Sequence, residues 1–183
     1  MKQMETERLL LREFRETDYE DIFNQVYADK EVWGLYSSIG SNPEEVRRRF
    51  MHRTYQPNNA KFGFRAVELK SSGRVIGQIH LEPHILNASN IPGDSASEFN
   101  TIEGELAFAF GKAYWGKGLA REACIPMIEY AFRELKLPRL VGGTTPNNHR
   151  SINLHKRLGY TVAPDPVDPE YMTTVLVNHP IDQ

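Results

Sequence analysis

The chain has 183 residues, of which 40% are hydrophobic and 25% charged, and its formal net charge is -2. This length and composition predict a single soluble domain over residues 1–183, large enough to bury a sizeable core. The nearly balanced charge excludes a global basic field for nucleic acid, and no apolar run approaches the roughly 20 residues that cross a membrane.

The first part of the chain predicts one strand, two helices and a hairpin. Thr17 and Glu20 have the spacing of a capping box at a helix start. Pro43 suits the first position of a second helix, which we expect to end before Pro57. Ser, Ser and Gly at 71–73 are typical of a turn between two strands. These elements are expected at 9–11, 18–27, 43–56, 62–69 and 74–81.

The second part predicts three more strands and two helices. Residues 83–101 are rich in Pro, Asn, Ser and Gly and form a long loop, of the kind that is often functional. Strands are expected at 105–110, 140–145 and 171–177, and helices from about 119 to 135 and at 151–158. This order is not the regular βαβ repeat, so we expect an α/β fold of the α+β type, with a mixed, mostly antiparallel twisted sheet flanked by helices.

The turn at 114–120, with the sequence YWGKGLA, is the most informative motif. Two glycines in alternate positions allow a tight turn with outward-facing N–H groups, and a helix begins at once. The unpaired N–H groups and dipole of that helix favour a bound phosphate. A dinucleotide-binding motif would need glycine at the position of Arg121, and the Walker pattern is absent. The turn therefore predicts a phosphate ligand of another kind.

These motifs resemble the GNAT acetyltransferases and, more narrowly, their RimJ/RimL-type branch. The similarity covers most of the chain and runs in order through 6–12, Gly77, 105–108, 114–123, 148–151 and 156–160. It implies a GNAT fold with acetyl-CoA as co-substrate, whose pyrophosphate would rest on the turn. Trp115 stands where Gln or Arg is usual in the family. The cofactor contacts that the resemblance implies are Phe108, Ala109, Phe110, Trp115, Gly116, Lys117, Gly118, Leu119, Ala120, Arg121, Asn148 and Ser151.

Acetyl transfer to an amine needs a general base, and Glu105 is the first candidate. It opens the strand before the turn and matches a glutamate that the RimJ/RimL-type branch uses, through a water. The alternative interpretation is a strand-end carboxylate in a surface ion pair. Glu103, on the same face of the strand, is the fallback base.

Two residues of the 148–158 region complete the catalytic set. Asn148 matches the family's asparagine and is expected to contact the cofactor, although asparagine is also a favoured helix cap. Ser151 shares both interpretations. His155 stands where many GNAT enzymes carry a tyrosine that protonates the departing thiolate. The alternative for His155 is a half-buried position packed against the sheet.

The remaining expectations concern compartment, partners and acceptor. Cys124 is the only cysteine, which excludes an internal disulfide and argues against a cysteine-based zinc site. We expect it in the core and expect no metal. The N-terminus has no apolar segment, so a cytoplasmic monomer or homodimer is expected, without nucleic-acid or membrane partners. The acceptor is an amine, either a protein N-terminus or a small molecule such as an antibiotic or polyamine. A non-catalytic acyl-CoA-binding module stays the alternative outside the enzymes.

Overall fold

The computed structural model describes residues 1–34, 42–54, 61–85, 102–165 and 168–178. The chain divides into two compact units. The first contains Met1–Leu81 and Ala107–Pro126, and the second contains Glu82–Leu106 and Met127–Gln183. The predicted loop at 83–101 lies largely outside the described residues, and its role stays a prediction.

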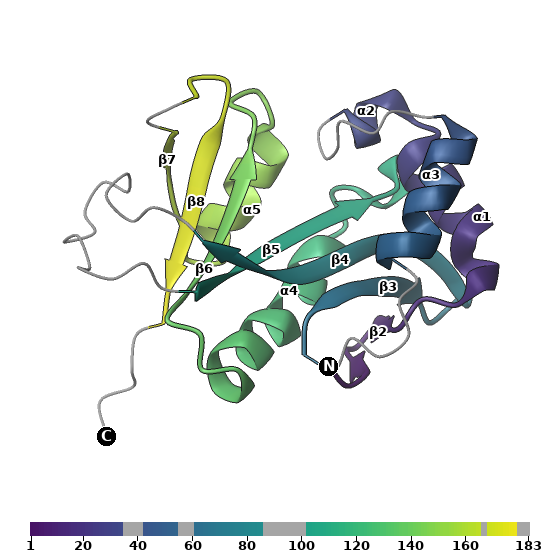
Figure 1. The fold of residues 1–183 in the computed structure, drawn as a ribbon, viewed down its shortest axis with the longest axis horizontal. Coiled ribbons are helices and arrows are strands. Elements are labelled where there is room, and N and C mark those ends of the chain that lie inside the picture. The colour runs from purple at the N-terminus through teal and green to yellow at the C-terminus, as the bar shows by residue number, and fades with distance from the viewer. Residues whose placement is uncertain (35–41, 55–60, 86–101, 166–167, 179–183) are drawn as a thin grey trace. The chain divides into compact units, whose positions relative to one another are not determined.

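Among the described residues, eight strands form a sheet in the order β1-β2-β3-β4-β5-β6-β8-β7. Figure 1 labels β2 to β8. The β5–β6 pair is parallel, and the pairs β1–β2, β2–β3, β3–β4, β6–β8 and β7–β8 are antiparallel. The predicted mixed, mostly antiparallel α/β fold is thus confirmed. The strands are β1 Met4–Glu5, β2 Leu9–Arg12, β3 Gly63–Leu69, β4 Arg74–Ile85, β5 Ile102–Phe110, β6 Arg139–Thr144, β7 Thr161–Pro164 and β8 Met172–Val177.

Three short helices of the first unit pack together over a buried apolar cluster. Phe14 and Phe50 meet edge to face, with ring centroids 5.4 Å apart, and join buried residues of β3 and β4 such as Ala66 and Val75. Burial of apolar surface is the main term holding such elements together. The helices are α1 Tyr19–Ile22, continued by a π-helical turn Phe23–Tyr27, α2 Lys30–Trp33, and α3 Pro43–Arg49, continued by a π-helical turn Phe50–Thr54.

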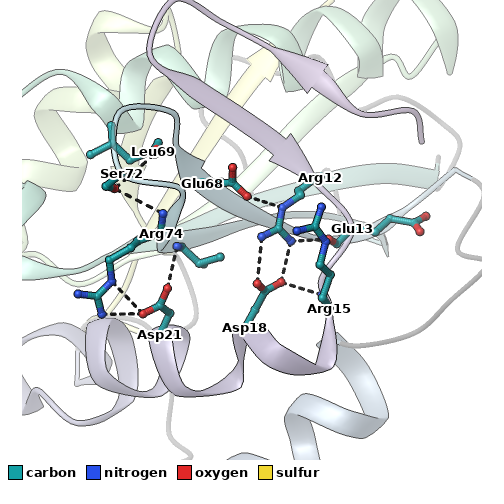
Figure 2. A network of polar contacts seen from close by, with 10 residues as sticks. Arg12, Glu13, Arg15, Asp18, Asp21, Glu68, Leu69, Ser72 and Arg74 are labelled. Atoms are coloured by element: carbon teal, nitrogen blue, oxygen red, sulfur yellow. Dashed lines mark hydrogen bonds and ion pairs between the residues drawn. The ribbon is translucent and has the colours of Figure 1, made fainter.

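A buried ion-pair network fixes the start of the first helical segment (Figure 2). The guanidinium of Arg12 donates to both carboxylate oxygens of Asp18, at 2.7 and 2.9 Å, and to Glu68 at 2.7 Å. Asp18 also accepts the backbone N–H of Arg15 at 2.7 Å. The predicted capping box of Thr17 and Glu20 is therefore wrong. A 3₁₀ turn at Glu16–Asp18 precedes α1 instead. The Asp18 side chain pairs with Arg12 and caps this turn by accepting the Arg15 N–H.

In the second unit, α5 (His149–Arg157) contacts β7, and β6 pairs with β8. Gly159, at φ +92°, follows the helix in the left-handed conformation that glycine tolerates, as predicted. The helix α4 (Leu119–Glu129) begins in the first unit and is continued by a π-helical turn Tyr130–Glu134 in the second. Two strands were not predicted, β1 and β7, because each is short and lacks a clear alternation of apolar residues.

Candidate active site

The glycine-rich turn between β5 and α4 alternates the sign of its φ angles. Gly116 and Gly118 have φ of +73° and +78°, and Lys117 between them keeps a negative φ. Such alternation points successive N–H groups to one side and forms a concave anion site. The first N–H groups of α4 lack partners within the helix, and its dipole is positive at this end. The turn therefore has the backbone conformation that a phosphate site needs, and phosphate binding there stays a prediction.

Neighbouring side chains position the turn and surround it. The indole N–H of Trp115 donates to the Phe110 carbonyl at 2.7 Å and anchors the turn to the end of β5. Leu119 is buried and Ala120 is half-buried at the helix start. Lys117 and Arg121 are exposed, and their contact with an anion stays a prediction.

The strand before the turn is held close to β4. A Cβ at Gly77 of β4 would lie 2.4 Å from the Ala109 carbonyl oxygen and 3.0 Å from the Cα of Phe110. Only glycine leaves room for β5 to lie this close to β4 at residue 77. This explains why Gly77 is among the residues that carry the family resemblance. Ala109 and Phe110 are buried, and Phe108 is half-buried beside the Phe110 ring.

The segment before β2 binds the turn from another side. The Arg8 guanidinium pairs with Glu122 of α4 at 2.6 Å and donates to the Lys117 carbonyl at 3.0 Å. Thr6 donates its hydroxyl to Glu122 at 2.5 Å. Burial would raise the pKa of Glu122, but the hydrogen bonds from Thr6 and Arg8 outweigh it and lower that pKa. Sequence reasoning placed 6–12 in the family motif and gave it no role.

The two candidate bases on β5 have opposite environments. Glu105 has a side chain 37% exposed, and its Oε2 lies 3.8 Å from Nδ1 of His84. Glu103 is fully buried and forms an ion pair with Arg139 of β6. A base must exchange protons with a substrate or water, so the environment favours Glu105. The pairing with His84 was not foreseen, because residues 84 and 105 are separated by the long loop.

The three predicted residues of the α5 region lie along the first two turns of that helix. The Asn148 side chain accepts the Ser151 N–H at 3.2 Å and caps α5. The Ser151 carbonyl lies 2.9 Å from Nδ1 of His155. A carbonyl only accepts, so Nδ1 carries the proton in the neutral ring, and Nε2 is then the acceptor. His155 is buried beside Tyr160, which agrees with its packed interpretation.

A glycine on β6 lies against the His155 ring. A Cβ at Gly142 would lie 3.0 Å from Oγ1 of Thr174, 3.3 Å from the Leu106 carbonyl oxygen and 3.7 Å from Nε2 of His155. Because Gly142 has no side chain, these three polar atoms can lie close to its backbone. In the sequence, the Gly142-Gly143 pair is the feature that could have indicated this close approach.

We expect His155 to make the stability of the protein depend on pH. Burial lowers its pKa, and the hydrogen bond to Ser151 only partly offsets this. The unfolded chain thus takes up a proton at higher pH than the folded one, so stability falls as pH drops below about 6.5. Urea unfolding at pH 7.5 and 5.5 should show a smaller loss in His155→Gln than in the wild type.

The exposed His149 supplies the matched control, since it lies on the same helix. His149→Gln should keep the full wild-type difference between the two pH values. An unchanged pH dependence in His155→Gln would contradict the assignment to the buried ring.

The structure thus places the predicted residues in two groups. The turn, with Phe108, Ala109, Phe110 and Arg121, lies in the first unit, and Glu105, Asn148, Ser151 and His155 lie in the second. Cys124 is fully buried, and burial raises the pKa of its thiol, so the predicted core position is confirmed. Within the described ranges, no three His, Cys, Asp or Glu side chains are grouped to hold a metal, and no helix is long and apolar enough to span a membrane.

Comparison with known proteins gives consistent matches. Residues 8–161 match the family described as Acetyltransferase (GNAT) domain. The N-acetyltransferase YnaD of Bacillus subtilis (strain 168), itself uncharacterized, is 28% identical over 154 residues, covering 84% of this chain and 79% of the relative.

Solved structures share the fold. An acetyltransferase of the GNAT family from Bacillus anthracis has a TM-score of 0.74 at 20% identity, covering 97% of this chain and 99% of that one. The ribosomal-protein-S5-alanine acetyltransferase from Vibrio fischeri has a TM-score of 0.68 at 17% identity and full coverage of both chains, 100% each.

Proposed function

Because the chain belongs to the GNAT acetyltransferase family, we propose that it moves an acetyl group from acetyl-CoA to a primary amine by direct attack within a ternary complex. The supporting observation is the turn at Gly116–Gly118, with its alternating φ angles at the start of α4. Its donors and dipole suit a pyrophosphate better than a neutral ligand.

The residues around the turn suit the rest of a CoA molecule. Lys117 and Arg121 are exposed cations for the outer phosphates. Strands β5 and β6 pair at Gly104↔Leu140 and Glu105↔Val141, and β5 then continues to Phe110. We propose that the pantetheine arm lies along the backbone of Phe108, Ala109 and Phe110. Asn148 and Ser151 stay proposed cofactor contacts on the family resemblance, since the Asn148 amide keeps two donors after capping.

Glu105 is proposed as the general base. Bound acetyl-CoA would supply an activated thioester carbonyl, and the attacking amine must be neutral. The half-exposed Glu105 carboxylate, 3.8 Å from Nδ1 of His84, can take the amine proton directly or through a water. The oriented binding of both reactants supplies much of the remaining rate.

His155 has a smaller proposed role. Its Nδ1 proton is committed to Ser151, and its lowered pKa makes the imidazolium scarce at neutral pH. Only the imidazolium could donate from Nε2 to the departing thiolate. A thiol has a pKa of about 8.5, so the thiolate is a fair leaving group and water can protonate it. We propose that His155 aids this step mainly below neutral pH.

For the acceptor we propose a protein N-terminus, as in the RimJ/RimL-type branch. Support comes from the 6–12 and 114–123 motifs and from the likeness to the Vibrio fischeri protein, whose name gives ribosomal protein S5 alanine as its target. Peptides with different N-terminal residues, set against polyamines and aminoglycosides, would test this choice. Turnover confined to the small amines would replace the peptide acceptor.

The cofactor assignment predicts a thermal shift with acetyl-CoA. At about 100 times Kd, a ligand that binds only the native state adds about 2.7 kcal/mol. For a chain of this size, the melting temperature should rise by roughly 5–10 °C. Gly118→Ala should lose most of this shift, because alanine resists the +78° φ that directs the N–H groups.

Gly73 gives the matched control, because it has φ +67° in the β3–β4 turn and a Cβ added there would meet no atom within 4 Å. Gly73→Ala carries the same backbone penalty and should keep the full acetyl-CoA shift. NAD and ATP should give no comparable shift in the wild type. A wild type that melts identically with and without acetyl-CoA would remove the proposed function.

A further inference from the structure

Arg8 lies outside every residue assigned above to the cofactor or the chemistry, yet it contacts the phosphate-binding turn. We propose that Arg8, held by Glu122, is a positioning residue that aims the Gly118 N–H at the phosphates of acetyl-CoA. This inference rests on the proposed function. Its contacts lie wholly within the first unit.

The carboxylate of Glu122 is fully occupied by the segment before β2. Its Oε1 accepts the Thr6 hydroxyl at 2.5 Å and the Arg8 backbone N–H at 2.8 Å. Its Oε2 accepts Nε and Nη2 of Arg8, at 2.7 and 2.6 Å. Four donors on one carboxylate fix its position and, through it, the plane of the guanidinium.

The fixed guanidinium then acts on the turn itself. Nη1 of Arg8 donates to the Lys117 carbonyl at 3.0 Å. In a trans peptide, the C=O of one residue and the N–H of the next point in opposite directions. The Lys117 carbonyl faces Arg8, so the Gly118 N–H points away from Arg8. Arg8 thereby selects one of the two orientations of this peptide.

Charge explains why an acidic residue is tolerated here. Glu122 lies in the first turn of α4, where an unpaired carboxylate would repel a phosphate. The direct ion pair with Arg8 cancels that charge. The two side chains form one unit, so loss of either should harm phosphate binding in the same way.

The test compares acetyl-CoA affinity and steady-state kinetics of Arg8→Ala, Glu122→Gln and the double variant. We expect Kd and KM for acetyl-CoA to rise about tenfold or more in each single variant, with kcat within about threefold of the wild type. The double variant should be no worse than the single ones, because residues of one network do not add. Arg8→Lys should recover little, since a lysine lacks the forked donors.

Arg74 supplies the matched control, as an exposed arginine of the same unit that joins β4 to α1 through Asp21 at 2.7 Å (Figure 2). Arg74→Ala should keep the wild-type Kd. Amide hydrogen exchange of the ligand-free protein gives an independent reading. Exchange at Gly118 and Leu119 should quicken in Arg8→Ala and stay unchanged in Arg74→Ala.

The outcomes separate the two proposals. A wild type that binds acetyl-CoA together with an Arg8→Ala that binds equally well would overturn the positioning role and leave the acetyltransferase proposal intact. Equal weakening by Arg8→Ala and Arg74→Ala would also overturn it, since the effect would then be general destabilisation. A wild type that binds no acetyl-CoA would overturn both proposals.

Discussion

Glu105→Gln should lower kcat by roughly 10² to 10⁴-fold while leaving Kd for acetyl-CoA within about twofold of the wild type. The substitution keeps the size of the side chain and removes its ability to accept the amine proton at neutral pH. A general base typically contributes a factor of this order. Steady-state kinetics with a peptide or amine acceptor, alongside calorimetric titration of acetyl-CoA, would measure both quantities.

The pH profile gives a second reading of the same variant. Deprotonation of the acceptor by hydroxide should partly replace the carboxylate, so the deficit should narrow as pH rises. Glu129→Gln, an exposed carboxylate on α4, serves as control and should keep full turnover. Wild-type turnover in Glu105→Gln would remove this residue from the mechanism.

Glu103→Gln should show the opposite pattern, with a large loss of stability and little loss of turnover by the folded enzyme. Glu103 is fully buried, and the side chain of its partner Arg139 is 7% exposed. Glu103→Gln takes this carboxylate away from the buried guanidinium, and breaking a buried pair by removing one charge costs about 3–5 kcal/mol. Thermal unfolding should shift down by roughly 2–4 °C for each kcal/mol.

A double variant isolates the source of that loss. Replacing both Glu103 and Arg139 by apolar residues of similar volume should recover much of the stability, because neither charge of this pair is then left buried. Glu105→Gln should melt like the wild type. A strong fall in kcat for folded Glu103→Gln would contradict the division of roles and return Glu103 to the candidate bases.

The sequence was sufficient to predict the elements whose signal is local. The conformation of the turn at 114–120 follows from its own residues. Its two glycines adopt positive φ angles, which other residue types rarely adopt. The α5 helix, expected at 151–158, runs over His149–Arg157 because Asn148 caps it. The β3–β4 hairpin follows from alternation around Gly73. In each case the residues within a few positions decide the structure.

What the sequence did not predict depends on partners distant along the chain. Glu103 and Glu105 look equivalent in sequence, and only Arg139 and His84 distinguish them. In the sequence, Asp18 is an ordinary residue of a first helical turn. In the structure, it pairs with Arg12 and accepts the Arg15 N–H at the start of the helical segment. Glu122 reads as a routine acidic residue at a helix start, and Arg8 lies 114 positions away from it. No local pattern carries such pairings.

The burial of Cys124 determines how the reaction can be followed. In the proposed reaction, transfer of the acetyl group releases CoA with a free sulfhydryl, which chromogenic disulfide reagents detect. The folded protein holds its single cysteine at 0% exposure, and a thiol with a raised pKa forms little of the reactive thiolate. Colour development therefore counts product turnovers rather than modification of the enzyme. The same reagent, added without substrates, titrates unfolded molecules, so one dye can report both activity and the intact fraction of a variant.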